Sequence, residues 1–201
     1  MNVNRRDFLC RSGAFAAVVA GQTTPIATSA SAASADSGQP AHNGRRDFDF
    51  FIGHWIVSAK RLRRRLTNDQ TWEAVTGTTR VTQILQGAGN VDEDEFQLPG
   101  QAYIGGMLRL FDAKQNNWST YGLDRDSGAP QPPQSGRFLA GRGEFYGNDE
   151  EGGRPIKVRH LYMDLTPVTC RWEQAFSLGE SGPYETNWVI DFTRMATRRN
   201  E

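Results

Sequence analysis

The stretch Tyr184-Glu185-Thr186-Asn187-Trp188-Val189-Ile190-Asp191-Phe192-Thr193-Arg194 decides the fold class, because its side chains alternate in character with a period of two. One face carries Trp188, Ile190 and Phe192, and the other carries Asn187, Val189, Asp191 and Thr193. This alternation is typical of a β-strand that buries one of its faces. The C-terminal segment is therefore predicted to be a strand with its aromatic face toward a core.

The same kind of pattern is present from Asp47 onward: short runs rich in aromatic and β-branched residues alternate with clusters of turn-forming residues. No long 3.6-residue periodicity interrupts them, and the proline-rich segment 124–135 reads as a longer loop. The predicted strands are residues 55–65, 72–86, 91–97, 102–112, 117–123, 136–146, 155–165, 169–177 and 184–194. Many antiparallel strands on short turns form a sandwich or a closed barrel.

The strand predicted over 155–165 indicates a partly polar interior. Its two faces are Ile156, Val158, His160 and Tyr162 on one side, and Lys157, Arg159, Leu161 and Met163 on the other. Neither face is purely apolar, whereas a solid core requires one clean face. A barrel interior that holds polar side chains fits this pattern.

Three stretches resemble a known family. The first is Asp47-Phe48-Asp49-Phe50-Phe51-Ile52-Gly53-His54-Trp55, an apolar plug followed by Gly-x-Trp; the others are Gly105 to Trp118 and Gly153 to Trp188. They resemble lipocalin-like (calycin) barrels and, more narrowly, the bacterial domain-of-unknown-function 1579 family, whose domains begin Phe-Asp-Phe-Trp-x-Gly-x-Trp. Phe51 and His54 depart from that opening. The resemblance spans about residues 47–194 and implies a single all-β, up-and-down antiparallel calycin-like barrel of about nine to ten strands. It implies no reaction.

The Gly-x-Trp element also predicts how one end of the barrel closes. Gly53 permits a close approach of the backbone where the chain turns under the barrel, and the Trp55 indole fills the closed end. In calycin-like proteins a basic residue of the last strand covers this ring, and Arg194 holds the matching position. The resemblance therefore implies a structural role for Gly53, Trp55 and Arg194.

The N-terminus predicts export through the twin-arginine pathway. Arg5 and Arg6 precede Phe8 and Leu9, a short, mildly apolar stretch follows, and small residues near 30–35 suit cleavage by signal peptidase. This apolar stretch of about ten residues is too short to anchor the chain, since a spanning helix needs roughly 20. We expect a signal peptide over residues 1–35, the Tat translocase as a partner during export, no stable membrane anchor, and a periplasmic or secreted protein.

Composition narrows the partners of the remaining chain. The flexible lead-in is predicted at 36–46 and the barrel domain at 47–196. Removing residues 1–35 takes three basic residues and one acidic residue from a neutral chain, which leaves a net charge of −2. This charge gives no electrostatic case for a nucleic-acid partner. Cys170 is the only remaining cysteine, so no intramolecular disulfide forms.

The candidate chemistry of the domain lies in its last three strands. No catalytic motif, metal-ligand spacing or nucleotide-binding loop is present, so we expect no catalytic residue, metal or cofactor. The acidic run Asp92-Glu93-Asp94-Glu95 and the basic run Lys60 to Arg65 are predicted to be solvated. The hypothetical ligand-binding residues are Arg159, His160, Tyr162, Arg171, Glu173 and Asn187, with an Arg159–Glu173 pair across neighbouring strands.

These observations favour a small, partly apolar ligand held in a barrel cavity. Two alternatives stay open, although the pattern leans away from an enzyme. One is a cofactor-free isomerase or cyclase that uses the cavity with a single acid or base. The other is a haem-binding barrel that uses His160.

Overall fold

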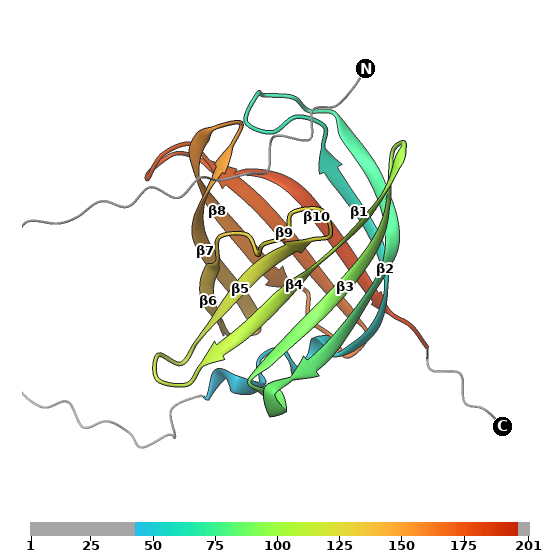
Figure 1. Cartoon of the computed structure of the whole chain (residues 1–201), viewed down its shortest axis with the longest axis vertical. Helices are drawn as coiled ribbons and strands as arrows, with labels where there is room; N and C mark the ends of the chain where they lie inside the picture. The colour runs from blue at the N-terminus through green and yellow to red at the C-terminus, as the bar shows by residue number, and fades with distance from the viewer. Residues whose placement is uncertain (1–42, 197–201) are drawn as a thin grey trace, which may run out of the picture.

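The computed structural model describes residues 43–196 of the chain, and these form a closed β-barrel (Figure 1). The strands are β1 (Gly53–Leu62), β2 (Trp72–Ile84), β3 (Gly89–Leu98), β4 (Gln101–Asp112), β5 (Asn117–Asp124), β6 (Gln134–Leu139), β7 (Arg142–Glu151), β8 (Arg154–Met163), β9 (Thr169–Ser177) and β10 (Glu185–Arg194). Three short 3₁₀ helices accompany them: η1 (Gly44–Arg46), η2 (Asp49–Phe51) and η3 (Leu85–Gly87).

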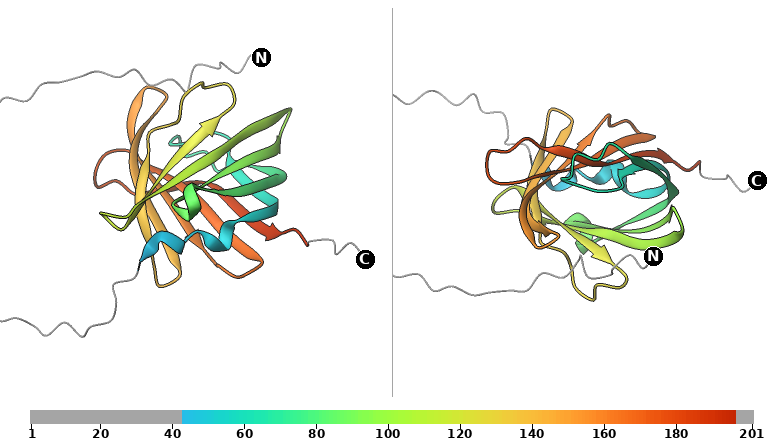
Figure 2. Two further views of the ribbon diagram at one scale, coloured as in Figure 1. Left: turned by 60° about the horizontal axis from the view of Figure 1, so that its bottom comes forward. Right: turned by 90° about the horizontal axis from the view of Figure 1, so that it is seen from above.

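Each strand pairs antiparallel with its neighbour in sequence, and β10 closes the barrel on β1. The predicted all-β, up-and-down antiparallel barrel is therefore confirmed, with ten strands. Among residues 43–196 every strand has a neighbour on both sides, and the shortest pairing is that of β5 with β6, which spans Trp118–Thr120 and Gln134–Gly136. The view from above in Figure 2 shows the strands running around a common interior.

The prediction of one strand over 136–146 is wrong. The chain turns there at Ala140-Gly141, so that Leu139 pairs with Arg142 and the segment is divided between β6 and β7. Ala140 and Gly141 both have positive φ, 49° and 78°. Positive φ at both central residues is the geometry of a two-residue hairpin turn that matches the twist of the strands.

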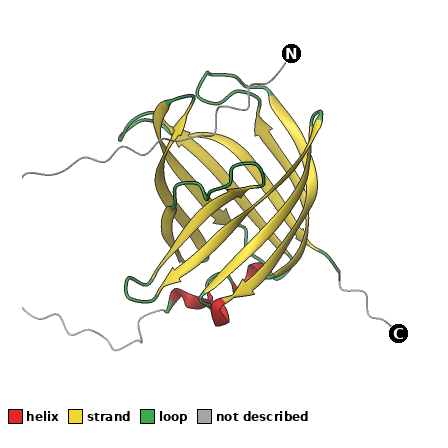
Figure 3. Ribbon diagram, in the orientation of Figure 1, coloured by secondary structure: helices red, strands yellow, loops and turns green. Residues whose placement is uncertain are grey.

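One end of the barrel is closed by residues 43–52, which we call the plug, and the helices η1 and η2 of the plug lie there in Figure 3. Phe48 and Phe51 are completely buried and pack edge-on against Trp118 and Phe192, respectively. Residues 43–46, predicted to lie in the flexible lead-in, are part of this structure, because the carbonyl of Gly44 accepts a hydrogen bond of 2.9 Å from Trp118 Nε1.

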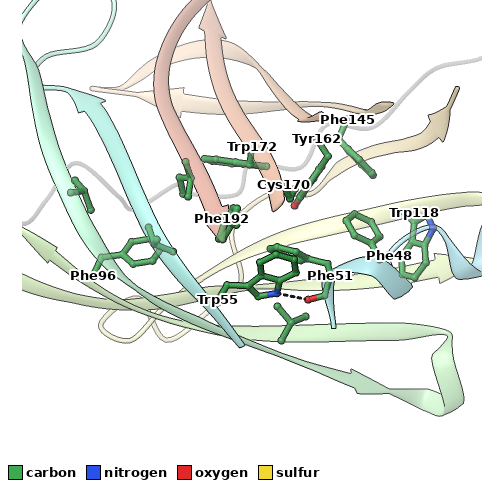
Figure 4. Packing of buried hydrophobic residues seen from close by; sticks show 14 of the residues in the cluster. Phe48, Phe51, Trp55, Phe96, Trp118, Phe145, Tyr162, Cys170, Trp172 and Phe192 are labelled. Atoms are coloured by element: carbon green, nitrogen blue, oxygen red, sulfur yellow. Dashed lines mark hydrogen bonds between the residues drawn. The ribbon is translucent and has the colours of Figure 1, made fainter. Parts of the chain in front are cut away.

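The closing stack implied by the resemblance is present. The guanidinium of Arg194 lies 4.1 Å from the centre of the Trp55 ring. Figure 4 shows the 2.8 Å hydrogen bond that Trp55 Nε1 donates to the carbonyl of Phe51. Arg194 also donates to the carbonyls of Phe50, Ile52 and Pro167. A Cβ at Gly53 would come within 2.6 Å of Arg194 Nη1, and Gly53 has a φ of 128°, so only glycine suits this position.

The predicted signal peptide, including Arg5 and Arg6, and most of the lead-in lie outside the described residues. Within residues 43–196, none of the helices is both long enough and apolar enough to cross a membrane.

Candidate functional site inside the barrel

Strand register shows which side chains point into the barrel. Trp55 on β1 and Phe192 on β10 belong to the buried core, and the alternate residues opposite them share this face through every strand pair. On β3 the inward positions are Asn90, Asp92, Asp94, Phe96 and Leu98; on β8 and β9 they are Ile156, Val158, His160, Tyr162, Cys170, Trp172, Gln174 and Phe176.

A buried ion pair lies inside the barrel, next to the plug. Arg109 on β4 is 2 % exposed, and its Nη2 donates to Asp92 Oδ2 at 2.7 Å. Arg109 Nη1 donates to Asn90 Oδ1 at 2.9 Å, and its Nε donates to the hydroxyl of Tyr162 at 3.1 Å. The guanidinium also lies 5.1 Å from the Phe51 ring centre. Every guanidinium nitrogen thus has a partner, which a buried charge requires.

The surroundings of Arg109 keep its guanidinium charged and keep the neighbouring Tyr162 hydroxyl protonated. Burial alone lowers the pKa of Arg109, but the carboxylate of Asp92 and the hydroxyl of Tyr162 outweigh burial, so the pKa lies above its usual value. Burial raises the pKa of Tyr162 to about 12, so its hydroxyl keeps its proton. It accepts the hydrogen bond of Arg109 and also contacts Met107 Sδ at 3.8 Å. These residues form a neutral polar layer that supports the plug.

The prediction that the acidic run 92–95 is solvated is wrong for two of its four residues. Because β3 alternates, Glu93 and Glu95 are exposed, whereas Asp92 is 6 % exposed and Asp94 points inward and is half-buried. Thr79 Oγ1 donates to Asp94 Oδ1 at 2.6 Å, and none of the described residues donates to Asp94 Oδ2. Burial, and then the neighbouring charge of Asp92, raise the pKa of Asp94 well above its usual value.

A second polar group, the distal cluster, lies on β8–β10 toward the end opposite the plug. Its members are His160, Trp172, Gln174, Asn187 and Trp188. His160 Nε2 lies 3.2 Å from Gln174 Oε1, and Gln174 Nε2 donates to Asn187 Oδ1 at 2.9 Å. Burial lowers the pKa of His160 to about 4, so the ring is neutral at pH 7. Because Nε2 donates to Gln174, the Nδ1 atom is the unprotonated acceptor.

Asn187 reaches this cluster through a β-bulge. The register of β10 shifts between Thr186 and Trp188, which leaves Asn187 without an opposing residue on β9. The alternation in the sequence placed Asn187 opposite to Trp188, but Asn187 is 1 % exposed and hydrogen-bonded to inward-facing Gln174. A bulge re-aims a side chain in this way.

The distal cluster contains three buried polar atoms with no hydrogen-bond partner: Trp172 Nε1, Trp188 Nε1 and His160 Nδ1. The tryptophans next to the plug differ, because both Trp55 and Trp118 donate to backbone carbonyls. A buried donor or acceptor without a partner costs about 1–3 kcal/mol. Two indole donors and one imidazole acceptor are therefore without hydrogen-bond partners in a single region of the interior.

Three of the predicted ligand-binding residues lie on the outer face of the barrel. Arg171 pairs with Glu173 at 2.9 Å and with Asp191 at 3.1 Å, and Arg159 stacks on Tyr184 at 4.7 Å. The predicted Arg159–Glu173 pair is wrong, because Arg159 is opposite Ala175 and Glu173 is opposite Leu161. His160, Tyr162 and Asn187 point inward, Tyr162 in the layer of Arg109 and the other two in the distal cluster.

Three aromatic rings narrow the interior beside the distal cluster, and we call them the aromatic triad: Phe96, Tyr103 and Trp188. The ring centres lie 6.0 Å apart for Phe96–Tyr103, 6.3 Å for Phe96–Trp188 and 6.5 Å for Tyr103–Trp188. Tyr103 and Trp188 point inward yet are only half-buried, so protein atoms do not completely fill the space beside them.

Outside the barrel interior, the described residues form a groove whose polar groups are already hydrogen-bonded to one another. A shallow groove of about 470 Å³ lies at the plug end, between Phe50, residues 165–167 and Arg194. Its polar groups already hold Arg194 in place. Among residues 43–196, no three histidine, cysteine or acidic side chains are grouped to hold a metal ion.

Comparison with known proteins identifies the fold. The chain is similar to an S-type phycobiliprotein lyase, CPES, from Guillardia theta, with 10 % identity and a TM-score of 0.52, over 79 % of this chain and 96 % of the lyase. It is also similar to EF1p2_mFAP2b bound to DFHBI, with 8 % identity and a TM-score of 0.37, over 76 % and 99 % of the two chains. The second likeness is too low to carry an argument.

No family model and no curated protein matches the chain. Fold and interior together define a closed, ten-stranded, up-and-down antiparallel barrel with a polar layer above a plug. Membership of the bacterial family named above stays a prediction.

Proposed function

We propose that this protein is an exported barrel that binds a small, partly apolar molecule in the distal half of its interior. The observation that carries the proposal is the set of unpaired buried atoms in the distal cluster. A barrel that only filled itself with side chains would give these atoms partners, as it does for Trp55 and Trp118. A ligand that carries both acceptors and a donor supplies the missing hydrogen bonds.

The walls of this region suit such a ligand. Trp172, Trp188 and Phe96 provide apolar and aromatic surface, and His160 Nδ1 provides an acceptor that stays unprotonated at pH 7. Small-molecule sites are mostly apolar with a few placed polar groups. The hydrogen-bonded chain from His160 through Gln174 to Asn187 fixes the imidazole, so the acceptor is oriented before the ligand arrives.

The test is recovery of the native ligand. The protein is purified from its own periplasm, and compounds that co-purify are extracted and identified by mass spectrometry. We expect one compound class at near-stoichiometric amounts in the wild type and at least a tenfold loss in His160→Phe. The matched control is His54→Phe, because His54 is on the same barrel but exposed. Equal recovery from both variants, or no compound from the wild type, contradicts the proposal.

One observation favours the isomerase or cyclase as a second candidate. Such an enzyme requires an acid or base inside the cavity, and Asp94 is an inward-facing carboxyl with one oxygen that accepts no hydrogen bond from the described residues. Incubating the recovered compound with fresh protein separates the two: a carrier returns it unchanged, whereas an enzyme converts it, and Asp94→Asn then abolishes conversion while binding persists. No comparable observation favours the haem-binding alternative.

The exported location is part of the proposal and is tested separately. Replacing both Arg5 and Arg6 by lysine is expected to leave the chain in the cytoplasm with residues 1–35 uncleaved. Replacing Arg11 by lysine, outside the arginine pair, serves as the control. Normal export of the double variant would contradict the assignment of the twin-arginine route.

A further inference from the structure

We infer that residues 63–71, which we call the lid, close the distal end of the barrel and lift to let the interior ligand enter and leave. The inference rests on the proposed function, because it names the device that controls access to the same site. Three observations carry it: the contacts of the lid across the barrel end, the burial of the apolar residues below it, and the pairing of its own arginines.

The lid joins β1 to β2, and Figure 1 shows this connection at the end of the barrel opposite the plug. Two neighbouring residues contact the wall formed by β7 to β10. Arg65 Nε donates to Glu151 Oε1 at 2.7 Å, and the Arg65 guanidinium lies 5.6 Å from the centre of the Phe176 ring. The backbone N–H of Leu66 donates to Glu185 Oε1 at 2.6 Å. The lid is therefore fastened to β7, β9 and β10 by side chains.

Leu66 is the side chain that fills the opening. It packs against Ile156 and Val158 on β8 and against Phe176 on β9. Ile156 is the third residue of β8 and Phe176 is the last but one of β9, yet they are only 3 % and 6 % exposed. Inward residues so near the end of a barrel are exposed unless another segment covers them. Their burial is the result of the lid lying on this end.

The distal cluster lies directly below these apolar residues. His160 is two residues after Val158 on β8, and Gln174 is two residues before Phe176 on β9, so both are the next inward positions toward the plug. The plug closes the opposite end with completely buried aromatic rings. A ligand therefore reaches the unpaired atoms of the distal cluster through the end that the lid covers.

The other contacts of the lid brace the lid itself. Arg63 at its base pairs with Glu73 of β2 at 3.6 Å, and the N–H of Arg63 donates to the carbonyl of Thr71 at 2.9 Å. Within the lid, Arg64 pairs with Asp69 at 3.0 Å. These contacts stay inside the lid and its own hairpin, so they are kept when Arg65 and Leu66 leave the wall. The lid can therefore lift as one unit.

The closed position of the lid also holds backbone strain. Leu66 has a φ of 57°, which is unfavourable for a residue with a Cβ, and its contacts with the wall keep it there. Once these contacts break, the backbone relaxes, which narrows the free-energy gap between the closed and the open lid. A segment held mainly by side chains opens without unfolding the barrel.

The rate constants of a small probe test the lid as the entrance. The probe is N-phenyl-1-naphthylamine, a neutral and largely apolar compound with one N–H donor, whose fluorescence rises when it leaves water. Stopped-flow mixing with the purified protein measures kon and koff. We expect both to rise by at least about tenfold in Leu66→Ala and by about threefold in Glu151→Gln, while Kd changes by less than about twofold. A gate changes both rate constants by one factor, because it does not touch the bound probe.

Matched controls remove the same groups away from the lid contacts. Leu139→Ala shortens an exposed leucine at the plug end of the barrel, and Glu150→Gln neutralises the exposed neighbour of Glu151. We expect the rate constants of the wild type from both controls. Melting temperatures establish that all four variants fold.

Hydrogen exchange tests the movement without any ligand. The Leu66 N–H is protected by Glu185 in the closed lid, and in the wild type we expect it to exchange at least about tenfold faster than the β1 amides paired with β10. Leu66→Ala is expected to accelerate exchange in residues 63–71 and to leave the β1 amides unchanged. If the Leu66 N–H exchanges only together with the β1 amides, the lid does not lift and the inference is wrong.

The kinetic outcomes separate this inference from the proposed function. If the probe binds and Leu66→Ala leaves both rate constants unchanged, or changes Kd as much as koff, the lid is not a gate while the interior site stands. If the probe binds neither the wild type nor Leu66→Ala, the inference is also wrong, and recovery of a native ligand decides the proposed function independently.

Discussion

At the scale of the residue, the buried tryptophans differ in whether the indole N–H has a hydrogen-bond acceptor. Trp118 Nε1 donates to the Gly44 carbonyl, whereas Trp172 Nε1 is buried without a partner. The two side chains are similarly buried, 1 % and 7 % exposed, so a change to phenylalanine removes similar packing from each. They differ in the hydrogen bond.

This contrast predicts two stabilities. Trp118→Phe leaves the buried Gly44 carbonyl without its donor, whereas Trp172→Phe removes an unpaired donor. We expect Trp118→Phe to lower the free energy of unfolding by about 1–3 kcal/mol more than Trp172→Phe does. Urea unfolding of the ligand-free proteins measures both. Equal losses would mean that the Trp172 indole has a partner in solution.

The contribution of Arg194 to the free energy of unfolding can also be measured by substitution. It lies on the Trp55 ring and donates to three carbonyls of the plug and the 165–167 turn. Arg194→Ala is expected to lower the free energy of unfolding by at least about 2 kcal/mol, since the stack is partly desolvated. Arg194→Lys keeps the charge without the planar fork and is expected to recover only part of it. A melting temperature unchanged in Arg194→Ala contradicts the role of the stack.

The inward acidic residues and Arg109 were missed at this scale, although a signal for them exists. Asp92 and Asp94 are four and two residues before Phe96, so a period of two places all three on one face. The cluster of four acids invited a solvated interpretation instead. Arg109, the partner of Asp92, is 17 residues away from it in the sequence, and only the pairing of β3 with β4 brings the two together.

At the scale of the element, most strands were predictable because turn residues separate alternating runs, and two irregularities were not. The hairpin of β6 and β7 turns on Ala140-Gly141, which lacks the asparagine or aspartate that usually marks such a turn. The bulge at Asn187 has no sequence signal, because one additional residue in a strand leaves the local composition unchanged.

The hairpin makes a prediction of its own. Ala140 has a φ of 49°, a conformation that is unfavourable for a residue with a Cβ by roughly 1–2 kcal/mol. Ala140→Gly is expected to raise the free energy of unfolding by up to about 1 kcal/mol, since part of the gain is offset by the freedom of glycine in the unfolded chain. Ala102→Gly, at an exposed position of β4, is the control and is expected to lower it. Destabilisation by Ala140→Gly would contradict the turn geometry.

At the scale of the whole molecule, the barrel separates two polar layers with different chemistry. The layer beside the plug is fully paired and holds the closed end in place, whereas the distal layer leaves donors and an acceptor unpaired. Closing one end tightly lets the other half of the interior keep these costly groups. The barrel was predictable from alternation and turns, but this division was not, because it depends on which strand faces point inward.

The neutral imidazole inside the barrel links stability to pH. Burial lowers the pKa of His160 from 6.5 to about 4, so between these values the unfolded chain binds a proton that the folded chain does not. The stability from this group is therefore complete above pH 6.5 and is lost as the pH falls toward 4, by at most about 1.4 kcal/mol per pH unit. Asp94, whose pKa is raised, acts in the opposite direction.

Comparing variants isolates the histidine, because Asp94 is common to all of them. The difference in free energy of unfolding between wild type and His160→Gln is expected to shrink steadily from pH 6.5 to pH 4. Exposed His54 provides the control, since His54→Gln is expected to leave the wild-type pH slope in place. If the two variants show the same slope, His160 takes up its proton at the same pH in the folded barrel as in the unfolded chain. Its Nδ1 would then be a donor below about pH 6.5, and the acceptor on which the proposed ligand site depends would be lost there.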